Sequence, residues 1–507
     1  MDISSSKALE TTSPKKSQNL QENKKGKKRW YIPKRYIITV LGSLGLFNVY
    51  AMRVNLSVAI VAMVNSTSNL NLTEFRKIKE CPSLLRYKTN TTAEIFKGEQ
   101  YNWDSNDQGI ILGSFFYGYL ATQLPGGILA EKFGAKWLYG GGVLVTAIFS
   151  LLTPLAADLG PTAFIAIRVL EGLGEGVTFP AINAAISCWS PKVERSRIST
   201  IVYTGALLGN VVAMPISGWL CSSEFMGGWP SVFYLFGSLG CIWFLFWSIL
   251  VYDTPSEHPG ISQEELSYIE QNKGAHSQEK KAIPWKHIFT SFPMWAVIIS
   301  HFGHNFGFLI LLTEMPTYLS TILHFDIQSN GLLSALPYIV QSICAMLAAY
   351  FVDKLRTSGN ISITTIRKIS NSVGLFGPSL CLLGITVSGC QPFLNVLLLT
   401  LAMAFNGFVY SGFNVTHVDM SPDFAGTLYG ITNTISNING IIGPLIVGYF
   451  TQSGATILNW NYVFYITAAM YSTSAIFYAV FASAEPQPWG IKKSEREKQH
   501  PLDTLKS

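Results

Sequence analysis

Long apolar segments, separated by short polar connections, make up most of the chain between residues 36 and 483. Each has about 20 residues or more, which is the length that a helix needs to cross a bilayer. The strands of a membrane barrel are about half as long, and their polar and apolar residues alternate. The pattern therefore predicts transmembrane helices. Twelve are expected, at residues 36–64, 106–130, 137–158, 162–189, 199–222, 231–252, 292–322, 329–352, 366–388, 393–416, 425–450 and 461–483.

A polar segment at residues 253–291 divides the expected helices into two sets of six, in residues 36–252 and 292–483. Within this segment, the sequence ISQEELSYIEQN has Ser262 in an N-cap position, which predicts a short amphipathic helix. The fold class that follows is an all-α membrane protein built from two six-helix halves, with a central loop between them.

Basic residues gather on one side of the expected helices. Residues 1–35 form a polar tail with ten Lys and Arg, which cannot bury a core and is expected to be disordered. Residues 484–507 form a second polar tail. Because basic connections stay in the cytosol, both termini are expected there. Further basic residues lie in the connections that follow even-numbered helices, among them Lys132, Lys192, Lys280, Lys354 and Arg367.

The connection at residues 65–104 carries three sequons for N-glycosylation, at Asn65, Asn71 and Asn90. Such sites are modified in the secretory lumen and then face the lumen or the cell exterior. The charge pattern places this connection on the same side. We therefore expect residues 65–104 to form a glycosylated luminal or extracellular loop.

The composition agrees with a membrane protein and offers no enzyme motif. Charged residues make up 13% of the chain, against about 25% in soluble domains. The net charge of +6 fits membrane topology better than nucleic-acid binding. The glycine-rich GLGEG lacks the following GKS or GKT of a phosphate loop, and no HExxH occurs, so no metal or cofactor is expected. A disulfide is one possibility among three cysteines outside the apolar runs, Cys81, Cys221 and Cys390.

Three charged side chains fall in the first half of the expected helix at 162–189. Arg168, Glu171 and Glu175 are spaced by three and four residues, so they share one face of a helix. A charge at the bilayer centre costs roughly 2.5–3.5 kcal/mol on insertion scales, so this face needs a partner or a cavity. We expect Arg168 and Glu171 to form a gating pair and Glu175 to exchange a proton near neutral pH. The alternative is that all three only brace helix packing.

Arg53 lies in the middle of the first expected helix. An arginine does not neutralise itself by losing a proton. Its planar guanidinium group can hold a carboxylate or a phosphate through two hydrogen bonds at once. The position therefore predicts an anion-binding residue that faces a water-filled cavity. The alternative is a structural ion pair with a neighbouring helix.

The sequence GGILAEKFGAK follows the second expected helix, and a weaker copy, AYFVDKLR, follows the eighth. The first copy resembles the signature loop of the major facilitator transporters. In that loop, small and charged residues form a tight cytosolic turn between two helices. The resemblance implies two similar halves with a binding site between them at the middle of the membrane. The residues that carry it are Gly127, Glu131, Lys132, Gly134 and Lys136.

Longer strings resemble the anion-transporting solute carriers within that superfamily, over about residues 36–485. They are AMRVNLSVAIVAMV, GSFFYGYLATQLPGG, RVLEGLGEGVTFPA and SGFNVTHVDMSPDFAGTLYGITNT. This group includes sialin, the vesicular glutamate transporters and the sodium–phosphate cotransporters. The sialin branch, whose members carry acidic sugars with protons, is the most similar. The glutamate branch has an arginine at His304 and a histidine at Leu112, which argues against glutamate as the substrate.

The resemblance also implies roles for individual residues. It links Arg53 with the anionic substrate and the Arg168, Glu171 and Glu175 motif with proton coupling. His301 matches the sialin pattern and, like His304, titrates close enough to physiological pH to relay a proton or contact an anion. Tyrosines at family-like positions are expected to line the substrate cavity, because a phenol offers both a hydroxyl and an apolar face. They are Tyr50, Tyr117, Tyr203 and Tyr318.

The function that we expect is secondary transport by alternating access. The leading hypothesis is symport of a proton with an acidic sugar such as sialic acid, and the main alternative is sodium-dependent phosphate cotransport. A membrane sensor or a polytopic enzyme is the alternative from another class. The carrier is expected to work as a monomer, in a lysosomal, vesicular or plasma membrane. The acidic dileucine sorting signal of sialin has no counterpart in the N-terminal tail, which leaves the membrane open.

Overall fold

The computed structural model describes residues 32–64, 81, 100–191, 194–272, 283–421 and 424–489. Short 3-10 turns η2, η3 and η4 lie at Phe225–Gly227, Pro255–Glu257 and Gly407–Ser411. The helices are α1 (Lys34–Met63), α4 (Ser105–Phe133), α5 (Ala135–Asp158), α6 (Pro161–Gly176), α7 (Thr178–Trp189), α8 (Arg195–Ser222), α9 (Pro230–Leu250), α10 (Gln263–Asn272), α11 (Trp285–Thr290), α12 (Phe292–Thr321), α13 (Ile327–Ser358), α14 (Ile363–Ser388), α15 (Pro392–Asn406), α16 (Phe413–Met420), α17 (Ala425–Asn437), α18 (Asn439–Thr451) and α19 (Ile457–Phe481).

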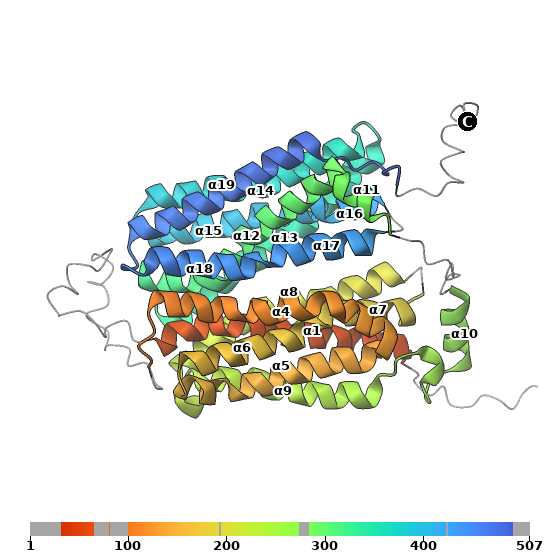
Figure 1. Ribbon diagram of the computed structural model, residues 1–507, viewed down its shortest axis with the longest axis horizontal. Helices are drawn as coiled ribbons and strands as arrows, with labels where there is room; N and C mark the ends of the chain where they lie inside the picture. Colours follow the sequence, from red (N-terminus) through yellow and green to blue (C-terminus); the bar gives the residue numbers. More distant parts are fainter. Residues whose placement is uncertain are drawn as a thin grey trace, which may run out of the picture.

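Two helical halves lie side by side, one built from α1 to α9 and the other from α12 to α19 (Figure 1). In the first half, α1 packs on α8 and α9, and α4 packs on α6. In the second, α19 packs on α12 and α14, and α15 packs on α13 and α14. The halves meet through α8 with α13, α4 with α18, and α1 with α12. The predicted fold class, an all-α protein of two halves, is confirmed.

Within the described residues, nine helical segments are long and apolar enough to cross a membrane by length and composition alone. One of them, Pro392–Met420, includes the η4 turn between α15 and α16. Three predicted segments fall outside this set and correspond to α4, to α6 with α7, and to α17 with α18. The last two are interrupted helices, broken at Val177 and Ile438. Each of the twelve predicted segments therefore overlaps one helix or one interrupted helix.

A polar cluster holds the start of α1 against the central loop. The predicted amphipathic helix is present as α10, and the Ser262 hydroxyl accepts a hydrogen bond from the Glu265 amide at 3.1 Å. Glu265 in turn accepts hydrogen bonds from the Lys34 and Arg35 amides, and Arg35 also pairs with Glu194 at 2.9 Å. The loop between the halves is thus anchored to the first half.

Glycines allow α4 and α6 to approach until their backbones touch. A Cβ atom on Gly172 would lie 2.0 Å from the Phe115 carbonyl oxygen, and one on Gly118 would lie 2.0 Å from that of Val169. Neither carbonyl can move without breaking its own helix, so only glycine fits at these positions. The contact places the charged face of α6 beside α4 and α1, where the candidate site lies.

We expect Gly172→Ala to lower the thermal stability of the purified protein in detergent. The added methyl group meets backbone rather than a mobile side chain, and overpacking of this kind costs typically about 1–3 kcal/mol. The matched control is Gly141→Ala on α5, where a Cβ atom would meet nothing within 4 Å. Fluorescence-detected unfolding compares the two variants. Equal midpoint temperatures for the two variants would show that the α4–α6 contact accommodates a methyl group at Gly172.

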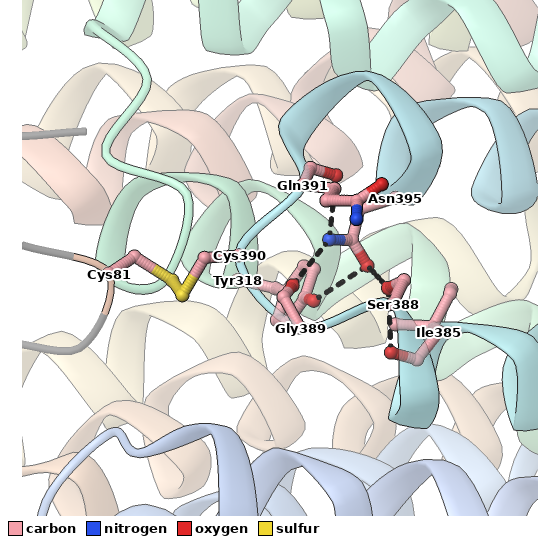
Figure 2. The surroundings of a disulfide bond; sticks show 8 residues. All are labelled: Cys81, Tyr318, Ile385, Ser388, Gly389, Cys390, Gln391 and Asn395. Carbon is pink, nitrogen blue, oxygen red and sulfur yellow. Dashed lines mark hydrogen bonds between the residues drawn. A yellow bond between two sulfur atoms is a disulfide. The ribbon is translucent and has the colours of Figure 1, made fainter. Parts of the chain in front are cut away.

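A disulfide joins the two halves at one end of the molecule. Cys81 follows the first helix and pairs with Cys390, in the turn between α14 and α15, with 5.3 Å between their Cα atoms. Figure 2 shows the side chain of Asn395 beside it, which holds the same turn. Asn395 donates hydrogen bonds to the carbonyls of Gly389 and Gln391, at 2.9 and 3.0 Å. Of the three cysteines considered from the sequence, Cys221 is buried and unpaired.

The disulfide predicts which thiols a membrane-impermeant reagent can reach. Disulfides form in oxidising compartments, so Cys390 is expected to face the lumen or the cell exterior. In sealed vesicles of known orientation, Cys81→Ser should gain labelling from that side, because Cys390 is only half-buried and loses its partner. Cys221→Ser is the control and should gain none. Labelling of Cys81→Ser from the cytosolic side alone would overturn this topology.

The halves are in backbone contact at the end that carries the disulfide, here called the disulfide end. A Cβ atom on Gly109 would lie 2.5 Å from the Pro444 carbonyl oxygen, and one on Gly218 would lie 3.2 Å from the Gly331 Cα atom. At the opposite end, where α17 begins, a Cβ atom on Gly426 or Gly430 would meet nothing within 4 Å. The path between the halves is thus closed at the disulfide end.

Candidate transport site

An ion pair between α1 and α6 forms the centre of the site. The Arg53 guanidinium contacts the Glu175 carboxylate, and both side chains are buried. Three rings surround the guanidinium, those of Tyr50 and Phe115 at 4.7 and 5.2 Å and that of Tyr119 at 4.8 Å. Spacing along α6 does not identify a partner for Glu175, because the partner, Arg53, lies on another helix.

A second buried ion pair lies on the same face of α6. Arg168 contacts Glu171, which also accepts a hydrogen bond from the Thr153 hydroxyl of α5 at 3.3 Å. The Arg168 guanidinium lies 5.2 Å from the centre of the Phe115 ring, on which Arg53 also packs. The charged face predicted for this helix therefore holds two ion pairs around one aromatic ring. Arginine and carboxylate charges balance within the pairs, which makes their burial tolerable.

Both arginines border a small cavity between the halves. Its volume is about 10 Å³, and Leu312 and Thr313 of α12 line it from the second half. Within the described residues, Nε of Arg53 and Nε of Arg168 make no hydrogen bond. A space of this size holds about one water molecule. An anion larger than that can bind between the arginines only if the helices around them move.

Histidines form a hydrogen-bonded cluster in the second half. Nδ1 of His301 lies 3.0 Å from the Thr432 hydroxyl, and Nε2 of His417 lies 2.8 Å from the same oxygen. His304 is bonded separately, to the Asn406 side chain at 3.1 Å. His417 was not among the residues predicted from the sequence, although it too is a titratable side chain, immediately after the predicted membrane helix at residues 393–416.

The predicted tyrosines do not all reach the site. Tyr50 packs on Phe179, which stacks on Tyr203, with 6.0 and 6.1 Å between ring centres. Tyr117 is 51% exposed, and Tyr119 occupies the position beside Arg53 instead. Tyr318 lies at the disulfide end of the second half, where its hydroxyl donates to Asn395 at 3.3 Å. The rings at Arg53 are therefore Tyr50, Phe115 and Tyr119, and Phe179 and Tyr203 extend from Tyr50.

The signature loop closes on the end of α9. Gly134 has φ +89°, which favours glycine, and a Cβ atom there would meet the Asp253 carboxylate at 2.5 Å. That carboxylate accepts a hydrogen bond from the Lys136 amide at 2.8 Å. The acid that holds this turn is thus Asp253. Lys132 is exposed, and the Glu131 side chain lies outside the described residues, as do Asn65, Asn71 and Asn90.

Residues 42–444 match the sequence model of the Major Facilitator Superfamily. The chain belongs to the Major Facilitator Superfamily. Membership explains the two packed halves and the signature loop at the end of α4. It also identifies the chain as a multi-pass membrane transporter rather than an enzyme.

Among curated members of the Major Facilitator Superfamily, the chain is similar to anion carriers. It is 45% identical to sialin of Homo sapiens over 90% of this chain and 91% of that protein. It is 38% identical to a candidate inorganic phosphate cotransporter of Drosophila melanogaster over 95% of this chain and 90% of the relative. Vesicular glutamate transporter 3 of Danio rerio is 40% identical, over 90% of this chain and 74% of the relative.

Solved structures of the superfamily share the fold. A bacterial homologue of the human lysosomal transporter Spinster, inward-facing and occupied, superposes with a TM-score of 0.67. The two sequences are 14% identical, over 90% of this chain and all of the other. A D-xylose–proton symporter gives a TM-score of 0.65 at 13% identity, over 89% and 98% of the two chains. At such low identity these likenesses concern the fold alone.

Proposed function

We propose that this carrier transports an organic anion, with an acidic sugar such as sialic acid as the leading candidate, together with a proton. The Arg53–Glu175 ion pair is the observation that carries the proposal. While Glu175 is ionised, its carboxylate pairs with the Arg53 guanidinium, so that group is not available to a substrate anion. Once Glu175 takes up a proton, its attraction for Arg53 falls and the guanidinium is free to hold the substrate carboxylate. Anion and proton therefore bind together, which is the condition for symport.

The surroundings of Arg53 suit a sugar that carries one carboxylate. Phe115 lines the cavity beside Arg53, and the Tyr50 and Tyr119 rings lie against its guanidinium group. Aromatic faces of this kind pack well on sugar rings. Arg168 with Glu171 is the gating pair in this scheme, since Arg168 lines the same cavity as Arg53. A water-filled route for the anion would open when the two halves separate.

The orientation that we propose places the disulfide end in the lumen or outside the cell. The disulfide, the three sequons and the basic connections support the same assignment. The termini are then cytosolic, and the path described above is closed toward the lumen. Sialin and the vesicular glutamate transporters among the relatives favour a lysosomal or vesicular membrane. The plasma membrane is the alternative.

Sodium-dependent phosphate cotransport is the second candidate. The similarity to a candidate phosphate cotransporter of Drosophila melanogaster favours it, and Arg53 could hold phosphate as readily as a carboxylate. In that case Glu175 would face a sodium ion in place of a proton.

Purified protein in proteoliposomes separates these functions. Uptake of sialic acid, inorganic phosphate and glutamate is measured under an imposed pH gradient and, separately, under a sodium gradient. We expect the pH gradient to drive uptake of sialic acid. Phosphate uptake that responds only to sodium would establish the second candidate, and no flux of any anion would refute both.

A further inference from the structure

A second and larger cavity lies between the halves at the disulfide end. Its volume is about 60 Å³, and both halves line it. Ser105 and Gln108 come from α4 of the first half, whereas Glu314 and Thr317 come from α12 and Thr451 from α18 of the second. On the scale used for the smaller cavity, where about 10–15 Å³ admits one water, this cavity has room for a few waters or for a small cation with water.

Of the described residues that line this cavity, Glu314 alone is charged. Its side chain is 3% exposed, and its Oε1 atom makes no hydrogen bond within the described part of the chain. The Thr317 hydroxyl lies beside the carboxylate but does not meet hydrogen-bond geometry. A buried carboxylate without a partner is strongly disfavoured unless a cation neutralises it. The closed cavity therefore suits Glu314 in its protonated or cation-bound form.

Among the described residues that line the cavity, none is basic, so no side chain there supplies that positive charge. Arg53 of α1 lines the smaller cavity with Leu312 and Thr313, does not line this one, and is already paired with Glu175. The helices α16 and α17 meet α12 at His301, nearer the opposite end. None of the other titratable groups on the elements around this part of α12 lines the cavity; they include Asp104, Asp107, Tyr338, Tyr449 and Tyr471.

We propose that Glu314 binds a monovalent cation, a proton or sodium, and thereby controls closure of the carrier at the disulfide end. When the halves separate there, Ser105 and Gln108 move away with α4, and water reaches the carboxylate, which can then release its cation. Closure buries the carboxylate again and requires that the cation return. The place of this closure step in the transport cycle rests on the proposed function. The step makes closure at the disulfide end depend on a cation at Glu314, in addition to the proton that binds Glu175.

The test measures closure directly and needs no transport. Spin labels are placed through Ser222→Cys on α8 and Gln328→Cys on α13, both exposed positions at the disulfide end of opposite halves. The five free cysteines are replaced, and Glu175→Gln removes the other proton site. We expect acid, or sodium at neutral pH, to raise the short-distance population. For one proton the closed-to-open ratio can change by at most about tenfold per pH unit.

Glu314→Gln and Glu314→Leu are each expected to stay closed at every pH and sodium concentration, because neither buries a charge. Asp107→Asn, which removes a carboxylate outside the cavity, is the control and should keep the full response. The cation that closes the parent protein identifies the ligand. The proposal is overturned if the parent responds to neither cation, or if the response persists in Glu314→Gln. Absence of anion flux would refute only the proposed function.

Discussion

Glu175→Gln is expected to abolish uptake driven by a pH gradient while anion exchange continues. Glutamine has the shape of a protonated glutamate but cannot release a proton. In the variant, Arg53 is permanently free to bind the anion, and the loaded carrier can reorient in both directions. Exchange of labelled for unlabelled anion at equal pH should therefore persist, whereas an imposed pH gradient should give no accumulation above the level without a gradient.

The comparison needs a control that changes a carboxylate without touching the site. Glu257→Gln, at an exposed position in the η3 turn, serves this purpose and should retain pH-driven uptake. Loss of exchange as well as accumulation in Glu175→Gln would mean that the carboxylate is needed for structure or for reorientation. Unchanged accumulation would remove Glu175 from the coupling mechanism.

Arg53→Lys is expected to weaken anion transport strongly although the charge is kept. Lysine replaces the planar fork with a single ammonium group, so one of two charged hydrogen bonds to the anion is lost. A hydrogen bond to a charged group contributes about 1.5–3 kcal/mol. At about 1.4 kcal/mol for each factor of ten, kcat/KM should fall roughly 10- to 100-fold. Initial rates of uptake over a range of anion concentrations measure this change.

A double variant distinguishes anion binding from helix bracing. Arg53→Gln alone leaves Glu175 buried without its partner, which costs about 3–5 kcal/mol when a buried pair is broken. Arg53→Gln combined with Glu175→Gln removes both charges and should restore the yield of folded protein without restoring anion exchange. If the double variant exchanges anion as well as Glu175→Gln does, Arg53 only braces the helices.

The positions of the helices along the chain could be predicted from the sequence, because apolar length and loop charge are local properties. The same holds for α10, which the N-cap at Ser262 predicts, and for the Arg168, Glu171 and Glu175 face, which follows from helical spacing. Contacts between helices do not follow from spacing. The Arg53–Glu175 pair joins α1 to α6, and the glycines that bring α4 against α6 lie at positions that only the fold identifies.

Three further features depend on tertiary contacts and could not be predicted from a single sequence. The choice of Tyr119 over Tyr117 beside Arg53 depends on the rotation of α4 about its axis. The pairing of Cys81 with Cys390 joins residues 309 positions apart. Glu314 lies in a mostly apolar part of α12, and nothing in its neighbours along the chain shows that it faces the other half.

Proton movement that accompanies the anion tests the central claim most directly. Proteoliposomes that contain a pH-sensitive dye receive sialic acid on the outside, with equal pH and no sodium on either side. Entry of the anion with a proton should acidify the interior of vesicles that carry the native protein. Vesicles with Glu175→Gln that are preloaded with unlabelled anion should take up labelled anion by exchange without acidification. Net anion entry into native vesicles without any change of internal pH would contradict proton symport through the Arg53–Glu175 site.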